Sequence, residues 1–247
     1  MSKLSKLPQI TIFFWIMKIC ATTLGETAGD AFSMSMNLGY LVSTGIFAVI
    51  VVAAVALQIR AKGYNPFLYW FTIIATTTVG TTLADFATRS LGIGYTGGST
   101  ILLILVIASL AVWRYAMGSV SVDNITTAKG EIFYWTTIIF SQTLGTALGD
   151  WFADTADFGY LGAAAIFGGV LLILVALYYF TSISRVILFW LAFIMTRPLG
   201  AVVGDFLDKP LDDGGLNLSR YVASLILVAV ITACIFIFPQ KASEEAH

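Results

Sequence analysis

The chain alternates between two kinds of long apolar segment. Segments of the first kind interrupt their apolar residues with threonine, glycine, serine and acidic residues, whereas segments of the second kind are almost purely aliphatic. Each segment is long enough to cross a hydrocarbon layer of about 30 Å as a helix. The pattern therefore predicts eight transmembrane helices, over residues 10–31, 40–59, 66–89, 99–117, 131–153, 160–181, 185–207 and 219–239.

One sequence pattern recurs four times without an insertion. Each copy starts at a tryptophan, has a glycine ten residues later and an aspartate five residues after that, and ends at a glycine nine residues further on. The copies start at Trp15, Trp70, Trp135 and Trp190. Each copy holds two predicted helices, so all four begin on the same side of the membrane and are parallel repeats rather than inverted ones. We assign one membrane domain, 1–247, with repeats at 8–62, 63–118, 129–183 and 184–240.

Four equivalent hairpins predict an all-α membrane bundle arranged as a ring. The joint between the second and third copies is longer than the others, so the ring has either fourfold pseudo-symmetry or a two-fold arrangement of pairs. We expect the polar helices to face inward and the aliphatic helices to face lipid. We also expect the recurring tryptophans to anchor at the membrane interface and the last glycine of each copy to form a left-handed turn.

The composition agrees with an integral membrane protein and excludes several functions. Hydrophobic residues make up 58% of the chain and charged residues 11%, against about 25% charged residues in soluble proteins. The net charge of −1 gives no basic surface for nucleic acid. The only histidine is His247, which argues against histidine-based catalysis and metal binding. We therefore expect neither enzymatic activity nor a bound cofactor.

Basic residues predict the orientation. Most basic residues lie near the two termini or in the joints that lead from an aliphatic segment to the next polar segment. They are Lys3, Lys6, Arg60, Lys62, Arg114, Lys129, Arg185 and Lys241. The positive-inside rule then places both termini in the cytoplasm. The first apolar segment lacks a small-residue cleavage site, so we expect it to be retained as a membrane helix rather than removed as a signal peptide.

The recurring aspartates are the candidate ion ligands: Asp30, Asp85, Asp150 and Asp205. They lie towards the outer ends of the polar segments, and an ionisable group at membrane depth is by default a candidate functional site. Gathered in a ring, four carboxylates would bind a cation. The alternative is that each aspartate caps or bridges its own hairpin loop.

A second polar layer is expected one to two helical turns deeper, at Glu26, Thr23, Thr78 and Thr143. Hydroxyl and carboxylate oxygens suit hard cations such as Mg²⁺, Ca²⁺ or Mn²⁺. Three charged residues break the repeat: Lys18, Glu26 and Arg197. In a closed ring the first and fourth repeats are neighbours, so Glu26 and Arg197 can form an ion pair. We expect Arg197 and Lys18 to act as a gate or as counter-charges. The alternative is that the Glu26–Arg197 pair is purely structural.

Recurring glycines predict close helix packing. The pattern of small residues four apart allows two backbones to approach, and we assign this role to Gly25, Gly29, Gly80, Gly145, Gly149, Gly200 and Gly204.

Three other functions are less favoured. A potassium filter needs a separate pore helix in each unit, copper ligands do not recur in the repeats, and an intramembrane protease needs one specific pair of aspartates.

The phrases FWIMKICATTLGETAGD and FWLAFIMTRPLGAVVGDFLDKP resemble a family of bacterial multi-pass inner-membrane proteins of unknown function, described only as membrane-anchored. The resemblance implies a helical bundle in the bacterial cytoplasmic membrane and no established chemistry. From the residues we expect a transporter or channel for a small inorganic cation, foremost a divalent metal ion such as Mn²⁺. Its partners would be the bilayer and the ion, with homo-oligomerisation left open. The alternative is a structural or sensory membrane protein.

Overall fold

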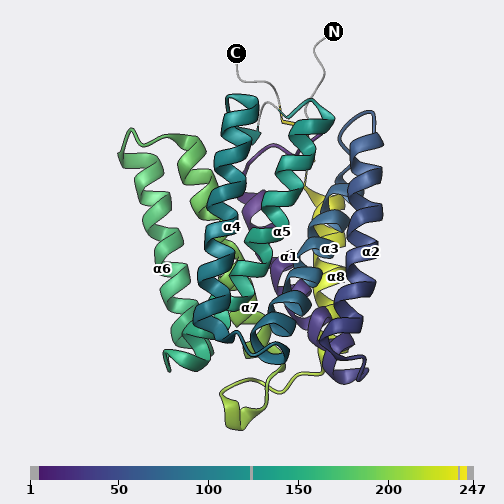
Figure 1. The fold of residues 1–247 in the computed structure, drawn as a ribbon, viewed down its shortest axis with the longest axis vertical. Coiled ribbons are helices and arrows are strands. Elements are labelled where there is room, and N and C mark those ends of the chain that lie inside the picture. The colour runs from purple at the N-terminus through teal and green to yellow at the C-terminus, as the bar shows by residue number, and fades with distance from the viewer. Residues whose placement is uncertain (1–5, 123–124, 239, 244–247) are drawn as a thin grey trace.

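The computed structural model describes residues 6–122, 125–238 and 240–243, so Lys3 and His247 lie outside the described residues. Within these ranges the chain forms eight α-helices and no named strand, which confirms the all-helical fold. The helices stand side by side in one upright bundle (Figure 1). Their bounds are α1 (Ile12–Asp30), α2 (Gly39–Arg60), α3 (Pro66–Asp85), α4 (Gly94–Met117), α5 (Ala128–Asp150), α6 (Gly159–Phe180), α7 (Arg185–Asp208) and α8 (Arg220–Ile237).

Local sequence sets the ends of these helices. Asn65 caps α3 by accepting a hydrogen bond from the Leu68 backbone N–H, and Pro66 occupies the first turn, where a missing N–H costs nothing. Immediately after the repeat aspartate, the chain widens into a π-helical turn in η1 (Ala31–Ser35), η2 (Phe86–Ser90) and η4 (Trp151–Thr155). The expected left-handed glycines are confirmed at Gly39, Gly94, Gly159 and Gly214, with φ of 72°, 71°, 62° and 83°.

Six helices in the described residues are long and apolar enough to cross a membrane, rather than the eight expected. The two that fall short are α1 and α5, which carry the most polar sequences. Lys18, Glu26 and Asp30 all lie on α1 and are all buried by neighbouring helices. Charged side chains that neighbouring helices cover do not face lipid, which explains why hydropathy alone misses this helix.

Four helices form a closed inner ring. Helix α1 packs against α3, α3 against α5, α5 against α7, and α7 against α1. Each remaining helix packs mainly on the inner helix of the following repeat: α2 on α3, α4 on α5, α6 on α7, and α8 on α1. The hairpins are therefore interlocked rather than placed side by side as separate units.

The recurring glycines make the inner ring tight, as expected. A Cβ atom on each first glycine would lie too close to the Cβ of one side chain from the next repeat. The distances are 2.8 Å for Gly25 and Thr77, 3.0 Å for Gly80 and Gln142, 2.5 Å for Gly145 and Arg197, and 2.6 Å for Gly200 and Thr22. The four partners share one position in the repeat, and the last contact joins the fourth repeat to the first. A second set is similarly close: Gly29 to Thr81, Gly149 to Ala201, and Gly204 to Glu26.

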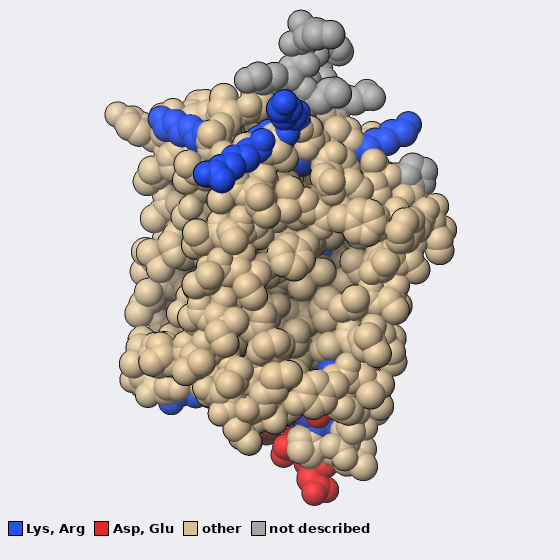
Figure 2. Space-filling view, turned by 90° about the vertical axis from the view of Figure 1, so that its right-hand side faces the viewer, with Lys and Arg blue, Asp and Glu red and all other residues tan. Residues whose placement is uncertain are grey.

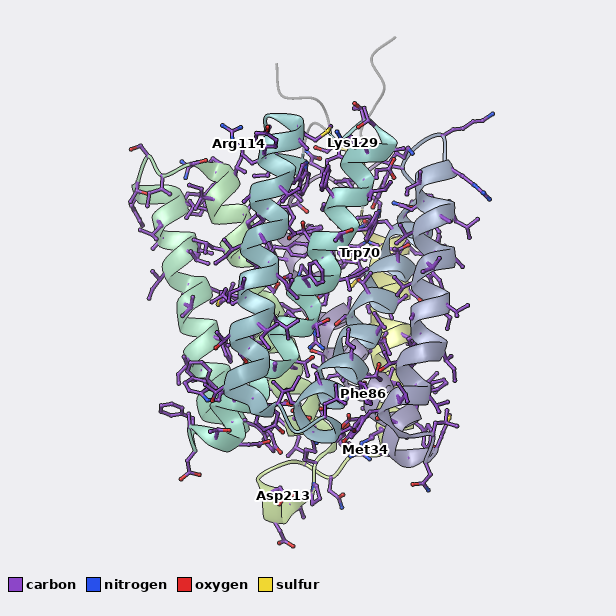
Figure 3. All side chains as sticks on the ribbon, in the orientation of Figure 1. Met34, Trp70, Phe86, Arg114, Lys129 and Asp213 are labelled. Atoms are coloured by element: carbon purple, nitrogen blue, oxygen red, sulfur yellow. The ribbon has the colours of Figure 1, made fainter. Side chains whose placement is uncertain are left out.

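Aromatic side chains fill one end of the inner ring. Trp70, Trp135 and Trp190 are buried, so the expectation that they anchor at the interface was wrong for these three. The hydroxyl groups of Tyr69 and Tyr134 lie 2.8 Å apart within this cluster. Figure 3 shows Trp70 inside the bundle rather than on its surface. Ring stacking and edge contacts, not lipid headgroups, therefore hold these residues.

The same end of the bundle carries the described residues nearest to both termini. The Gln9 N–H donates to the Lys241 carbonyl at 3.0 Å, and the Ser243 N–H donates to the Leu7 carbonyl at 2.8 Å. Figure 3 places Arg114 and Lys129 at this end and Asp213 at the other. Figure 2 shows basic side chains gathered at the first end and the exposed acidic side chains at the second. We call these the basic end and the acidic end.

Candidate functional site

One guanidinium group lies at the centre of the inner ring. Arg197 Nη2, from α7, donates to Glu26 Oε2 on α1 at 2.9 Å and to Thr81 Oγ1 on α3 at 2.7 Å. It also donates to Thr146 Oγ1 on α5. A single nitrogen atom thus contacts all three other inner helices, which places it near the axis of the ring. The Arg197 side chain is completely buried.

Glu26 forms the expected ion pair with Arg197. Its Oε2 atom also accepts hydrogen bonds from Thr81 at 3.2 Å and from Thr146 at 3.4 Å. A buried ion pair needs additional hydrogen bonds to compensate for lost hydration, and the two threonines supply part of them. Arg197 Nε and Nη1 are buried without a hydrogen-bond partner in the described chain. Neither threonine was a candidate from the sequence. Both stand eleven residues after their repeat tryptophan, as Glu26 does, and that shared position was the available signal.

The predicted threonine layer lies elsewhere. Thr23, Thr78 and Thr143 are buried, but their hydroxyl groups donate to carbonyls of their own helices, at 3.0, 2.8 and 2.9 Å. Thr27, one turn beyond Thr23 on the same stripe, lies 2.8 Å from the Ser224 hydroxyl on α8. In the first repeat this stripe therefore faces an outer helix, and the structure does not join these threonines to Glu26.

Lys18 is buried closer to the basic end. Its ammonium donates to the Phe193 carbonyl at 2.9 Å and to Thr196 Oγ1 at 2.7 Å, and it lies 3.8 Å from the centre of the Phe193 ring. No ion pair among the described residues joins Lys18 to a carboxylate. Both polar atoms of the Gln142 side chain are also buried without a hydrogen-bond partner in the described chain. The interior between the aromatic cluster and Arg197 is therefore polar.

The four repeat aspartates lie at the acidic end in two bridged pairs. Arg89 binds Asp85 at 3.1 Å and Asp150 at 3.3 Å. Lys209 binds Asp205 at 3.0 Å and Asp30 at 2.6 Å. All four carboxylates are buried.

The alternative was that the aspartates cap or bridge their own hairpin loops. Asp85 and Asp205 do pair with Arg89 and Lys209, which follow them by four residues. Asp30, Asp85 and Asp150 make no side-chain capping bond to the π-helical turns that follow them. Each bridge instead connects an aspartate to the aspartate of the next repeat. The cation in the bridge comes from the second or the fourth repeat, so the bridges follow a two-fold pattern rather than a fourfold one.

The bridging residues Arg89 and Lys209 were not among the candidates from the sequence. Both follow their repeat aspartate by four residues, and this spacing puts two side chains on one helical face. Burial lowers the pKa of Lys209, but Asp205, Asp30 and Asp208 raise it by more, so its pKa lies well above the ordinary value. Lys209 is therefore a fixed positive charge at neutral pH.

The pair that contains Lys209 has an additional carboxylate. Asp208 pairs with Arg220 at 3.2 Å, and Arg220 also lies 3.7 Å from Asp30. Asp30, Asp205 and Asp208 can each present one carboxylate oxygen within 4.8 Å of the others. Asp208 Oδ1 is buried without a hydrogen-bond partner in the described part of the chain. Carboxylate oxygens in this arrangement can hold a hard cation.

An apolar cavity of about 550 Å³ lies away from these groups, between α1, α6 and α7. Trp15, Leu172 and Phe189 are among its lining residues, and no acidic residue is among the described side chains that line it.

Four segments of the chain, residues 13–64, 68–119, 133–184 and 188–239, match the family described as Repeat of Unknown Function (DUF347). The chain belongs to the DUF347 family. This confirms the expected membership of a four-repeat family of unknown function. Each DUF347 repeat here contains one inner helix and the outer helix that follows it. No curated protein and no solved structure matches the chain.

Proposed function

We propose that this DUF347 protein transports a small inorganic cation across a membrane, foremost a divalent metal ion such as Mn²⁺. One observation carries the proposal: aspartates from all four inner helices lie in bridged pairs at one end of a ring whose centre holds an ion pair. Asp30 stands one helical turn beyond Glu26, so the two charged layers are adjacent. Helices can pack against one another without so many buried charged side chains.

All eight helices cross the bilayer in this proposal, with pseudo-symmetry around the ring axis. Helices α1 and α5 have 19 and 23 residues, and at about 1.5 Å per residue they match a hydrocarbon thickness of about 30 Å. Both stand in the ring between α3 and α7, which qualify as spans on their own. The positive-inside rule assigns the basic end and both termini to the cytoplasm of a bacterial inner membrane.

The conformation described here is closed to cations. Arg197 places a positive charge at the centre of the ring, and the aromatic cluster around Tyr69 and Tyr134 fills the basic end. A cation that reaches the aspartates meets this charge next, so passage requires the Glu26–Arg197 pair to move. The pair therefore acts as a gate. In the transport cycle the protein alternates between conformations that are never open to both sides of the membrane at once, rather than forming an open pore.

Flux measurements on the purified protein test the proposal. In proteoliposomes that contain a Mn²⁺-quenched dye, the wild-type protein should admit Mn²⁺ faster than empty vesicles. Asp30→Asn and Asp150→Asn each remove one carboxylate from a different bridged pair and should slow entry at least about tenfold. Asp213→Asn is the matched control, because Asp213 is exposed in a loop at the same end. Wild-type rates in both site variants would refute transport through these aspartates.

A structural or sensory role remains the second candidate, and one observation favours it. Arg89, Lys209 and Arg220 already pair with the aspartates, as they would in a static scaffold. In that case the asparagine variants lower the yield or the melting temperature of the protein, and wild-type vesicles show no flux above empty vesicles.

A further inference from the structure

The second and fourth repeats differ where they supply the bridging cation. The second repeat has Thr88 and Arg89, whereas the fourth has Asp208 and Lys209 at the same positions. The Thr88 hydroxyl donates to the Ala84 carbonyl of its own helix at 2.8 Å. Asp208 instead directs its carboxylate to the neighbourhood of the bridged aspartates. The pair bridged by Arg89 therefore has two carboxylates and the pair bridged by Lys209 has three.

The two bridging cations also differ in how firmly they hold their partners. Arg89 uses two different nitrogens, Nε and Nη2, for its two carboxylates, and a planar guanidinium fixes both directions at once. Lys209 contacts both of its carboxylates with a single nitrogen on a flexible stem. An ammonium is a compact charge that another cation can replace, whereas a guanidinium fork is matched to its partners.

The three carboxylates have the spacing of metal ligands. Their nearest oxygens lie within 4.8 Å of one another, and opposite ligands of an ion bound at about 2.4 Å lie about 4.8 Å apart. Asp208 supplies the independent sign of a ligand, because its buried Oδ1 atom has no hydrogen-bond partner among the described residues. Lys209 already shows that a positive group fits between Asp30 and Asp205.

We propose that Asp30, Asp205 and Asp208 form a divalent-cation site that the Lys209 ammonium occupies in the closed protein, and that the metal ion binds by displacing this ammonium. Three carboxylates beside Arg220 leave two negative charges, which a divalent ion neutralises and a monovalent ion does not. The biological role of this site rests on the proposed transport function, but its occupancy by metal does not.

The Lys209 backbone can stay in place while its side chain moves. The Lys209 N–H donates to the Asp205 carbonyl at 2.8 Å, and its carbonyl accepts from the Asn217 N–H at 2.9 Å. Its side chain is 12% exposed and therefore has a path to solvent. The exposed loop that follows carries Asp212, which offers the displaced ammonium a new partner.

Binding of Mn²⁺ to the full-length protein in detergent tests the site. The electron paramagnetic resonance signal of free Mn²⁺ falls as the ion binds, and this gives a dissociation constant for each variant. Lys209→Gln removes the competing ammonium and should bind Mn²⁺ at least about tenfold more tightly than wild type. Lys209→Arg keeps a cation that grips both carboxylates and should bind no more tightly than wild type. Asp208→Asn should bind at least about tenfold more weakly, while Asp213→Asn should match wild type.

The outcomes separate this proposal from transport. Equal affinity in wild type, Lys209→Gln and Asp208→Asn would overturn the site, as would equally tight binding by Lys209→Gln and Lys209→Arg. If Lys209→Gln does not fold, wild type compared with Asp208→Asn and Asp213→Asn still decides whether Asp208 is a ligand. If the protein transports Mn²⁺ but substitutions of Asp208 and Lys209 leave the Mn²⁺ dissociation constant unchanged, only the proposed metal site is overturned. If these substitutions change the Mn²⁺ dissociation constant as expected but the protein shows no flux, only the proposed transport function is overturned.

Discussion

The contact of Gly200 with Thr22 is one of those that close the inner ring between the fourth and the first repeat. A Cβ atom on Gly200 would lie 2.6 Å from Thr22 Cβ and 3.0 Å from the Thr22 carbonyl carbon, with the Thr22 hydroxyl oxygen closer still. Gly200→Ala therefore cannot be accommodated by a rotation of the Thr22 side chain alone. Helix α1 must move away from α7, and the contacts around both helices must repack.

The size of the effect follows from the backbone contact. Overpacking of a buried contact typically costs about 1–3 kcal/mol, and the backbone atom in this contact favours the upper part of that range. The helix-propensity gain of a glycine-to-alanine change, about 0.5–1 kcal/mol, offsets part of the cost. Adding Thr22→Ala to Gly200→Ala should recover only part of the loss, because the Cβ of residue 22 remains 2.6 Å from the new methyl group.

The outer helices supply a matched control. Gly45 in α2 and Gly168 in α6 have no atom within 4 Å of the position where a Cβ would be added. Gly45→Ala and Gly168→Ala should therefore stabilise the protein by about 0.5–1 kcal/mol. Thermal unfolding followed by tryptophan fluorescence suits the measurement, because Trp70, Trp135 and Trp190 are buried and report on the packed interior.

The expected order of melting temperatures is Gly45→Ala above wild type and Gly200→Ala below it, by roughly 2–4 °C for each kcal/mol. A Gly200→Ala protein that melts at or above the wild-type temperature would show that α1 and α7 are not in close contact. The closed ring, and with it the central position of Arg197, would then be wrong.

Three further changes probe the charged and aromatic layers. Glu26→Gln leaves the buried charge of Arg197 without its carboxylate and should cost about 3–5 kcal/mol in the same thermal assay; an unchanged melting temperature would contradict the buried pair. Tyr69→Phe removes the hydrogen bond to Tyr134 and should cost about 0.5–1.5 kcal/mol, whereas a neutral result would argue against that contact. The pKa of Lys209 is raised above its ordinary value of 10.5, so its contribution to stability is complete below that pH and is lost only as the pH rises through the higher folded value. The stabilisation that wild type has over Lys209→Met should therefore still be present at pH 10 and be lost only in stronger alkali; equal melting temperatures of the two proteins at pH 10 would contradict the raised pKa.

The spacing of the repeat predicts much of the fold because its determinants are local. Helix bounds follow from apolar length, and the left-handed turns follow from glycines such as Gly39 and Gly94. The rotation of each inner helix about its own axis does not follow. Thr81, which contacts Arg197, and Thr78, which bonds to its own helix, differ by three positions. Both lie in a stretch of α3, residues 75–82, in which every residue is buried. With no solvent-facing stripe, an apolar pattern cannot indicate which threonine faces the axis.

Symmetry itself limits which charges the axis can hold. A ring of identical repeats brings identical side chains to one level, and four arginines or four glutamates at the level of Arg197 and Glu26 would repel one another without water to screen them. Buried charge near the axis is therefore stable only where the repeats differ, and Glu26 and Arg197 each occur in one repeat alone. The aspartates, which do occur in all four repeats, need cations from residues that do not, namely Arg89 and Lys209. The positions at which the four repeats differ thus supply the charged groups that pair inside this ring.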